Sequence, residues 1–513
     1  MFRRQARRSG FDTIVRSDYP GPQKPRNSAL INDLQMATRR YEWIISLIFL
    51  ATLPLANAWV RGDGVGYYAY ARAPLIEHHL DFTHDYQFAN QSFREGRVDA
   101  NGQPLELFRT PTRHLDNHFT VGPAMLWAPF LVVAHAGVLI ARAMGSGIAA
   151  DGFSAPYRYA MAVGTCVYGF LALLLSYRLA RKYTSPLWAF LACLAIWWAS
   201  SLPVYMYFNP SWSHAHSAFA VALFLWYWDR TRSKRSVSQW VILGLLTGLM
   251  LNVYYANLMV VAVLAVEGIR RYAAILKRKQ AIGDEVLDLT AKYLLFGFVV
   301  CIALLPTFLS RWIVYGGPFE TGYVTLRNFL WSSPALLEVL FSANHGLLAW
   351  TPLLAISLLG IGLLAWERPE VGVPLAAASV AFYLFFTLYP DWAGISSYGN
   401  RFFVSLTAVF IVGLAVALER FAKLFRRERV AAMVSAAILG VFVLWNLGLI
   451  YQWGTHLIPA RGAISFRQAA YNQVYVVPRQ LSSQMRAYIF RRSDLMRQIE
   501  QKDVEQLKKE TNP

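Results

Sequence analysis

The chain has 513 residues, of which 56% are hydrophobic and 15% charged, and its mean hydropathy is +0.33. This composition is too apolar for an ordinary soluble domain of that length, so we expect an integral membrane protein. The formal net charge of +19 would suggest nucleic-acid binding in a soluble protein. Here most Lys and Arg residues stand in short runs between apolar segments, where they indicate membrane topology, and nucleic acid is not an expected partner.

The cysteines and the start of the chain indicate no separate chemistry. Each of the three cysteines lies inside an apolar stretch without CxxC or metal-ligand spacing: Cys166, Cys193 and Cys301. We therefore expect neither a disulfide framework nor a zinc site. Residues 1–42 are polar and basic, and no small-residue cleavage signal follows the first apolar run. This pattern predicts a retained cytoplasmic tail rather than a signal peptide.

Eleven segments are apolar and long enough for membrane-crossing helices, which need roughly 20 residues. They lie at 43–60, 157–180, 186–205, 214–228, 238–252, 256–272, 291–313, 346–366, 371–389, 402–420 and 430–451. A twelfth apolar stretch, residues 119–141, carries Pro123 and Pro129 in its first half. Counting this stretch as a span would invert the side of every later segment.

Charge decides between the two topologies. The tail before residue 41 holds nine Lys or Arg residues, so the positive-inside rule places it in the cytoplasm and residues 61–118 outside. If residues 119–141 do not cross, all four basic turns are cytoplasmic: RLARKYTS, DRTRSKR, RRYAAILKRK and KLFRRER. We therefore predict that 119–141 is a re-entrant or interfacial helix bent by its prolines.

The predicted fold is an all-α polytopic membrane domain over residues 43–452, with about eleven transmembrane helices. Residues 61–141 form its first extracytoplasmic loop, which contains the interfacial helices. The basic tail, residues 453–513, then also lies outside, although its charge fits the rule poorly. It either rests on anionic headgroups or leans on the first loop. Such a protein belongs in a bacterial inner (plasma) membrane, with the polar segments facing the periplasm.

Asp63 is the first candidate for chemistry. It stands a few residues after the first predicted span, between Gly62 and Gly64, in the sequence RGDGVGYYAY. A carboxylate at this place can act as a general base on an incoming hydroxyl at the membrane surface. It can equally cap the helix predicted to begin at Val65. The two roles are compatible, and the spacing does not choose between them.

A second candidate is the alternation of His114, Asp116 and His118 in RHLDNHFTVGP. In an extended segment these three side chains point the same way, which suits a metal site or a phosphate-binding cluster. No fourth ligand stands in register, and a solvated polar loop is the simpler interpretation. The metal is therefore unknown: no cofactor is implied, and a divalent metal is left open.

The segment NPSWSHAH, residues 209–216, supplies further candidates in Asn209 and His214. His214 and His216 are two residues apart, so they diverge on a helix and would not share a metal. A single histidine can still reach a site at the membrane surface. The alternative is that both are core histidines of the span that follows.

Arg401, in SYGNRFF, stands at the outer edge of a predicted span, where basic residues are scarce. It can bind a phosphate with two hydrogen bonds, or it can anchor the span at the interface. Trp392 and Tyr398 lie in the same external segment. Their rings could stack on a sugar or a lipid, or they could belong to the aromatic belt common at membrane interfaces.

In organisation, residues 40 to 420 resemble the GT-C superfamily of polytopic glycosyltransferases, in the branch of protein O-mannosyltransferases and lipid A aminoarabinose transferases. The matching features are a cytoplasmic N-terminus, one span, a long external loop with an acidic residue near its start, and a proline-bearing interfacial helix. In this chain they correspond to Asp63 in RGDGVGYYAY and to the segment HFTVGPAMLWAPF. Basic cytoplasmic turns such as RLARKYTS follow, as in the family.

The chain also departs from the family pattern. Many relatives have an acidic residue and a proline in the loop after the third span, where this chain has Asn209 and Pro210. Many have an Arg-Pro pair where this chain reads NVYYAN, residues 252–257. These differences bear on metal binding and on the contact to the donor lipid rather than on the architecture.

The resemblance implies inverting transfer of a sugar from a polyprenyl-phosphate donor to a lipid, glycan or protein acceptor. Asp63 would be the general base, and Arg401 and His118 would bind the donor phosphate. No nucleotide-binding loop is present in a suitable setting. The alternative is a transporter or lipid flippase, but few charges lie within the spans and no repeated halves are evident. An O-antigen ligase type of enzyme would have its large external loop late in the chain.

Overall fold

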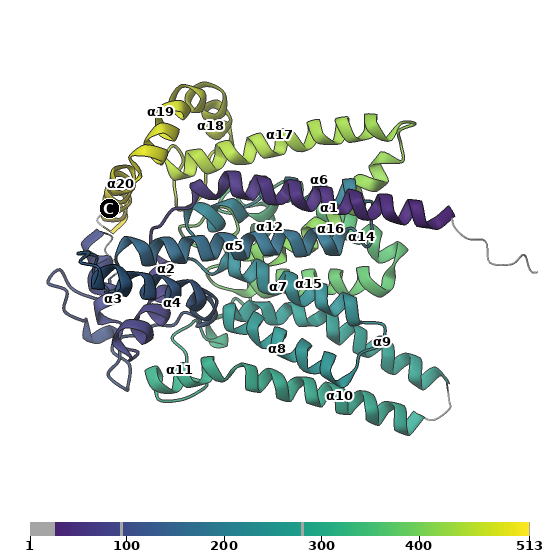
Figure 1. Cartoon of the computed structure of the whole chain (residues 1–513), viewed down its shortest axis with the longest axis horizontal. Coiled ribbons are helices and arrows are strands. Elements are labelled where there is room, and N and C mark those ends of the chain that lie inside the picture. Colours follow the sequence, from purple (N-terminus) through teal and green to yellow (C-terminus); the bar gives the residue numbers. More distant parts are fainter. Residues whose placement is uncertain (1–25, 93–95, 279–281, 512–513) are drawn as a thin grey trace, which may run out of the picture.

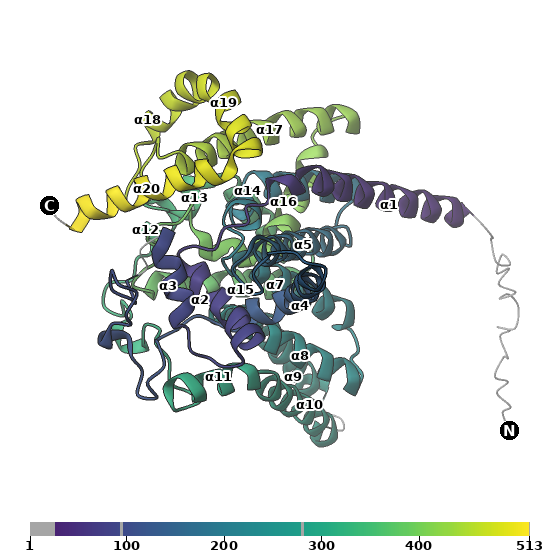
Figure 2. The same cartoon turned by 60° about the vertical axis from the view of Figure 1, so that its left-hand side comes forward.

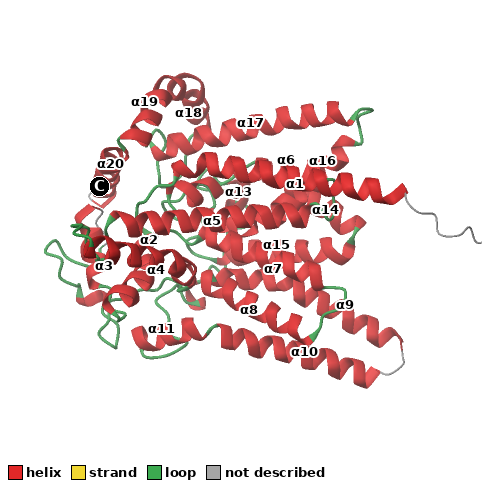
Figure 3. Cartoon of the chain, in the orientation of Figure 1, coloured by secondary structure: helices red, strands yellow, loops and turns green. Residues whose placement is uncertain are grey.

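The computed structural model describes residues 26–92, 96–278 and 282–511. Residues 1–25 of the predicted cytoplasmic tail lie outside this part. The described chain is helical and contains no strand, only two isolated bridges in the first loop (Figure 3). The all-α prediction is therefore confirmed.

Long helices lie side by side and form the body of the molecule (Figure 1). They are α1 (Arg26–Thr52), α5 (Ala155–Ala180), α6 (Pro186–Trp198), α7 (His214–Thr231), α8 (Val237–Val253), α9 (Ala262–Arg278), α10 (Ile282–Ala303), α14 (Leu353–Glu367), α15 (Pro369–Leu388), α16 (Thr407–Ala422) and α17 (Glu428–Gly454). Each of the eleven segments predicted to cross overlaps one of them. Six described helices are long and apolar enough to cross a membrane by themselves: α4, α5, α15, α17, most of α10, and α16 with the turn before it. The protein is therefore an integral membrane protein.

The remaining α-helices gather mainly at one end of the bundle, which we call the Asp63 end. They are α2 (Asp63–Arg72), α3 (Thr83–Ser92), α4 (Gly122–Ala143), α11 (Leu305–Tyr315), α12 (Glu338–Phe341), α13 (Leu347–Trp350), α18 (Phe466–Tyr471), α19 (Val477–Phe490) and α20 (Arg492–Thr511). Helices α2, α3 and α18–α20 are seen together at the left of Figure 1.

The chain segments before and after α4 both contact α2, although α4 is long enough to cross a membrane. Just before it, Asn117 donates a hydrogen bond to the carbonyl of Gly66 in α2, at 2.9 Å. Just after it, the carbonyl of Gly152 accepts a hydrogen bond from Tyr68 in α2, at 2.7 Å. The two flanks of α4 are therefore tied to neighbouring turns of one short helix, as the predicted interfacial or re-entrant helix requires.

The predicted span 291–313 has wrong boundaries. Helix α10 begins at Ile282 and ends at Ala303, and a separate helix, α11, begins at Leu305. Pro306 stands in the first turn of α11, where it lacks the N–H that a continuous helix would need. The sequence 304–313 is apolar enough to extend the span, but the proline divides it. Consequently α11 belongs to the Asp63 end rather than to α10.

Helix α16 lies in the core of the bundle. Its residues from Thr407 to Val416 are all buried. A side-chain carbon on Gly360 of α14 would lie 1.8 Å from the carbonyl oxygen of Gly413 in α16, so only glycine permits this close approach. The short 3-10 helix η7 (Arg401–Leu406) leads directly into α16. Arg401 is thus fixed to a rigid, buried helix.

A buried ionic cluster holds the first loop together. Arg72 at the end of α2 donates to Asp85 in α3, with Nε–Oδ1 at 2.7 Å, and to Glu77, with Nη1–Oε1 at 2.8 Å. The side chains of Arg72 and Asp85 are only 1% and 2% exposed. Such a buried charge needs all its partners, because removal of one leaves another uncompensated. The cluster therefore fixes α2, and with it Asp63, against α3.

The C-terminal helices fold back across the Asp63 end (Figure 2). Tyr488 in α19 donates to the carbonyl of Leu55 at 2.8 Å, and Arg492 donates to the carbonyl of Pro54 at 2.7 Å. In α20, Glu500 accepts from Trp59 Nε1 at 2.6 Å. The tail therefore packs on the end of the first predicted span, just before the first loop.

Candidate functional site

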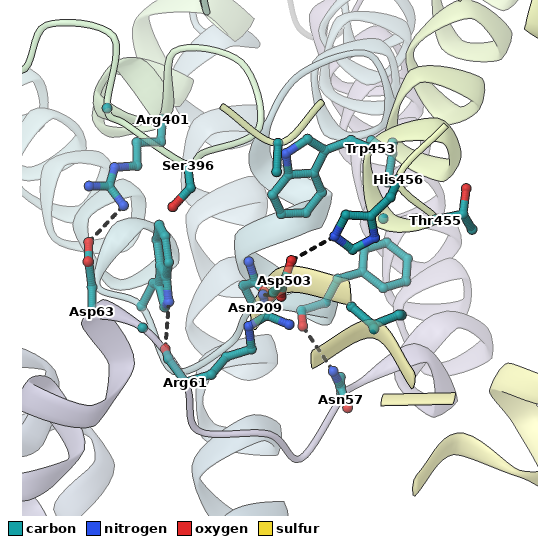
Figure 4. Close-up of a pocket in the computed structure, with 18 of the residues that line it drawn as sticks. Asn57, Arg61, Asp63, Asn209, Ser396, Arg401, Trp453, Thr455, His456 and Asp503 are labelled. Atoms are coloured by element: carbon teal, nitrogen blue, oxygen red, sulfur yellow. Dashed lines mark hydrogen bonds and ion pairs between the residues drawn. The ribbon is translucent and has the colours of Figure 1, made fainter. Parts of the chain in front are cut away.

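The centre of the site is an ion pair between two segments far apart in sequence. Asp63 stands in the first turn of α2, and Arg401 begins η7. Arg401 Nη1 lies 2.7 Å from Asp63 Oδ2, and the two side chains are 12% and 32% exposed (Figure 4). The carboxylate therefore has a fixed cationic partner and still faces open space. Asp63 and Arg401, which were separate candidates in the sequence, therefore belong to one site.

The ring of Trp212 packs against the Arg401 guanidinium of this pair. The Arg401 guanidinium carbon lies 4.5 Å from the centre of the Trp212 ring, a cation–π distance. Trp212 Nε1 in turn donates to the carbonyl of Arg61 at 3.0 Å. A side-chain carbon on Gly64 would meet Ser211 Oγ at 2.0 Å, so α2 and the loop before α7 are in close contact there. These contacts fix the position of the guanidinium before any ligand binds.

The interpretation of Asp63 as the cap of a helix beginning at Val65 is wrong. Helix α2 begins at Asp63 itself, and its N-cap is Gly62, whose φ of +55° a residue with a side chain rarely adopts. Asp63 is still in the first turn, where the helix dipole favours a negative charge. Its carboxylate nevertheless points toward Arg401 rather than toward the helix N–H groups.

Both residues line a cavity of about 1440 Å³ at the Asp63 end. Near the ion pair the lining is polar and aromatic, and three predicted residues contribute to it: His118, Asn209 and His214. Tyr67 also lines this part, and burial followed by the charge of Asp63 raises its pKa to about 12. Tyr67 is thus a neutral hydroxyl beside the carboxylate. The cavity then continues between α17, α19 and α20, where apolar side chains dominate.

Asp116 does not line the cavity but supports His118. Its carboxylate pairs with Arg97 at 3.1 Å and lies 3.7 Å from His118 Nδ1. Burial alone would raise the pKa of Asp116, but the neighbouring His118, a hydrogen bond from Tyr315 and the charge of Arg97 lower it to about 2. Asp116 is therefore an anion that positions the His118 ring at the cavity wall.

The predicted histidine–aspartate cluster is not assembled as a metal site. The ring of His114 shares a hydrogen bond with Thr112 Oγ1 at 3.0 Å instead of joining Asp116 and His118. Within the part of the chain that the structure describes, no group of three or more His, Cys, Asp or Glu side chains is placed to hold a metal ion. The alternation in sequence therefore does not produce a shared ligand set.

Two predicted aromatic residues lie outside the cavity lining. Tyr398 is fully buried, and its hydroxyl donates to Asn446 Oδ1 in α17 at 2.8 Å. Trp392 is partly buried, and its carbonyl accepts a hydrogen bond from Asn400 at 3.2 Å. In this structure both hold the 389–401 segment in shape, so neither is placed to stack on a ligand in the cavity.

Sequence reasoning missed several lining residues, above all those of the C-terminal tail. Arg61, Trp212, Tyr254 and Tyr323 all line the cavity near the ion pair. Arg61 carries the same signal as Arg401, a basic residue at the outer rim of a span, and could have been found. The tail residues carry no such signal, because their contacts to the first loop join positions more than 400 residues apart.

The fold and the site together define a polytopic all-helical membrane protein with an acid–arginine pair in a cavity at one end of its bundle. No protein-family model matches the chain, and no curated protein matches it. Among solved structures, the chain is similar to the crystal structure of the Archaeoglobus fulgidus oligosaccharyltransferase in the apo form, with a TM-score of 0.45 and 16% sequence identity. The similarity covers 90% of this chain and 56% of that one, so the chain spans little more than half the length of that protein.

Proposed function

We propose that the protein is a membrane glycosyltransferase of the GT-C type. It transfers a sugar from a polyprenyl-phosphate carrier to a hydroxyl of a lipid, glycan or protein acceptor. The observation that carries the proposal is the Asp63–Arg401 pair, which faces a cavity that is polar at the pair and apolar further along. A lipid-linked phosphosugar has the same division, with a hydrophobic chain and a charged, hydroxyl-rich head.

The distribution of charge supports an extracytoplasmic site. At the far end of the bundle, Arg178 of α5 pairs with Glu42 of α1 at 2.8 Å, and Arg235 pairs with Glu267 of α9 at 2.7 Å. The basic turns that follow α5 and α7 are therefore at the end opposite Asp63. The positive-inside rule favours a cytoplasmic location for that far end, which supports our proposal that the cavity faces the periplasm of a bacterial inner membrane.

In the proposed reaction, the acceptor oxygen attacks the anomeric carbon from the face opposite the phosphate. The new C–O bond forms as the bond from carbon to the phosphate oxygen breaks, so the configuration inverts. Asp63 takes the proton of the acceptor hydroxyl, and polyprenyl phosphate leaves with the bonding electrons. Arg401, with His118 nearby, stabilises the charge that develops on the departing phosphate.

The resting ion pair gives this mechanism an order of events. Without a donor, Arg401 is occupied by Asp63 at 2.7 Å. A donor phosphate competes for the guanidinium, because arginine can bind a phosphate with two parallel hydrogen bonds. The carboxylate is then released toward the acceptor hydroxyl. Donor binding would thus precede effective proton abstraction.

The test uses the purified protein in lipid nanodiscs with a panel of polyprenyl-phosphate-linked sugars and labelled acceptor extracts. Asp63→Asn is expected to lower kcat by about 10²–10⁴, the usual contribution of a general base, while donor binding persists. Arg401→Ala is expected to weaken donor use by about 10²–10³ without changing acceptor preference. Asp81→Asn is the matched control, since Asp81 lies in the same loop and uses Oδ1, which asparagine retains, to cap Thr83.

Retention of most activity by Asp63→Asn would remove this residue from the chemistry. Unchanged donor dependence in Arg401→Ala would leave the arginine as a structural anchor. Uptake of labelled substrate into proteoliposomes, with no product formed, would instead establish a transporter.

A further inference from the structure

Three helices present facing apolar stripes to the cavity that contains Asp63 and Arg401. The stripe on α17 follows helical spacing: Leu444, Leu447, Gly448 and Tyr451. The stripe on α19 does the same: Val477, Leu481, Met485 and Tyr488. Helix α20 adds a third: Leu495, Met496 and Ile499. Residues at i, i+3, i+4 and i+7 share one face of a helix, so the three faces enclose a common space.

The apolar part of the cavity is not filled by the protein's own side chains. Leu444 is 68% exposed, and Leu481 and Met485 are each 42% exposed. In water, this much exposed apolar surface on facing helices would be costly. Helix α17 is also apolar and long enough to span the membrane, so the opening between α17 and α19 adjoins lipid. The space is therefore suited to a hydrocarbon chain.

The remaining lining fixes the orientation of such a chain. The cavity is also lined by two further basic residues, Lys502 and Arg61, of which Arg61 pairs with Asp503. The charges of Lys502 and Arg401 suit a phosphate, and the apolar end suits its lipid tail. We infer that the space between α17, α19 and α20 is the binding groove for the isoprenoid chain of the lipid-linked donor, with the chain's phosphate held at Arg401. This inference rests on the proposed function and names the element that selects its donor.

The wall of the groove is held in place by contacts independent of any lipid. Trp59 donates to Glu500 Oε1 at 2.6 Å. Asp503 pairs with Arg61 at 2.5 Å and with His456 at 2.6 Å. These contacts join α20 to the start of the first loop and to the end of α17. The groove therefore exists before the donor arrives, and its shape can discriminate between chains.

Discrimination by shape is the expected mode of action. The donor's tail is already dissolved in the bilayer, so moving it into an apolar groove gains little hydrophobic free energy. What the groove adds is a defined path from the membrane to Arg401, which a long chain must follow and a short chain can avoid. Filling the groove should consequently affect long-chain donors far more than short-chain donors.

The first experiment fills the groove and varies the donor. Leu447→Trp and Leu481→Trp place a large ring in the groove from each side. The matched controls are Val441→Trp on α17 and Ile489→Trp on α19, since these positions are 67% and 53% exposed and do not line the cavity. The donors carry the same sugar phosphate on a long polyprenyl, a farnesyl or a geranyl chain.

We expect the two groove variants to lower kcat/KM for the long-chain donor by about tenfold or more, the size of an overpacking penalty. Activity with the short-chain donors should stay within about twofold of the unmodified protein, and the control variants should behave like that protein. An equal loss with all three donors, or an equal loss in the control variants, would overturn the inference.

The second experiment needs no sugar transfer. A polyprenyl phosphate with a diazirine in its chain is photolysed with the intact protein in nanodiscs, and the labelled peptides are identified by mass spectrometry. Labelling within 444–451 and 477–488, blocked by Leu447→Trp, supports the groove. Labelling on other helices overturns the inference. Stronger labelling of the same peptides by a diazirine phosphatidic acid also overturns it, because the groove would then be a site for an acyl lipid. Labelling at the groove with no transfer activity would uphold the lipid site and contradict the glycosyltransferase proposal.

Discussion

The docking of α20 over the cavity should depend on pH through one carboxylate, Glu500. Glu500 is 3% exposed, and its Oε1 accepts a hydrogen bond from Trp59 Nε1 at 2.6 Å. Burial raises the pKa of Glu500 from 4.5 to about 7, although the bond from Trp59 and the charge of Arg61 oppose the rise, and Asp503 adds to it. The docked helix therefore prefers a protonated Glu500.

The sign follows from the direction of the change. An acid whose pKa is raised in the docked state contributes stability that is fully present below about 4.5 and is lost as the pH rises through about 7. The difference between 4.5 and about 7 corresponds to about 3 kcal/mol. Between pH 5 and pH 8, most of it should disappear, about 2.5 kcal/mol or roughly 70-fold in the docking equilibrium. Asp503 has the opposite dependence, because its pKa is lowered below 3.8, so its contribution is complete at both pH values.

Hydrogen exchange of residues 492–505 at pH 5 and pH 8, corrected for the intrinsic rates, measures this equilibrium. Protection should fall by roughly 70-fold in the unmodified protein and change little in Glu500→Gln. The difference between these two proteins isolates Glu500 from Asp503, whose charge acts on it, and from His456, which pairs with Asp503. Glu505→Gln, which alters an exposed acid on the same helix, should keep the full dependence. Constant protection in the unmodified protein, or a flat response in Glu505→Gln, would refute the reasoning.

Two further predictions separate structural residues from the site. Asp85→Asn leaves buried Arg72 with only Glu77 as an anion, so it should lower the free energy of unfolding by about 3 kcal/mol. Thermal unfolding measures this loss. An unchanged Tm would show that Glu77 alone can balance the charge of Arg72. Tyr398→Phe removes the hydrogen bond to Asn446 and should lower the free energy of unfolding by about 1 kcal/mol. Its kcat should stay within about twofold of the unmodified protein, because Tyr398 lies outside the cavity. A folded variant without activity would place this residue in the mechanism.

Much of the architecture could be predicted because lipid imposes strong local rules. Apolar stretches must be helical, and basic turns mark one side, so charge alone indicated that residues 119–141 return to the side they leave. The structure shows both flanks of α4 tied to α2. The boundary at Leu304 was missed because hydropathy continues through it, whereas the break depends on one proline.

The site was predictable only in its separate parts. Asp63 and Arg401 each stood out as a charged residue where a span meets the outer surface, but nothing in the sequence indicates that they contact each other, since that depends on how α2 and α16 pack. Tyr398 illustrates the opposite error, because an aromatic residue at an interface looks the same in sequence whether it faces a ligand or the core.

The sequence left two positions open for the C-terminal wall and could not choose between them, for a physical reason. Helix α19 is amphipathic and α20 is largely polar, so their sequence favours a surface but does not specify which one. Their position is set by a few polar contacts to the end of the first span, such as Trp59–Glu500 and Arg61–Asp503. Arg61 stands out as a basic residue at the rim of a span, but its partner Asp503 and the residues Trp59 and Glu500 carry no such signal. The groove that these helices complete is therefore a property of tertiary packing, and a change that undocks α20 should alter donor choice without touching Asp63 or Arg401.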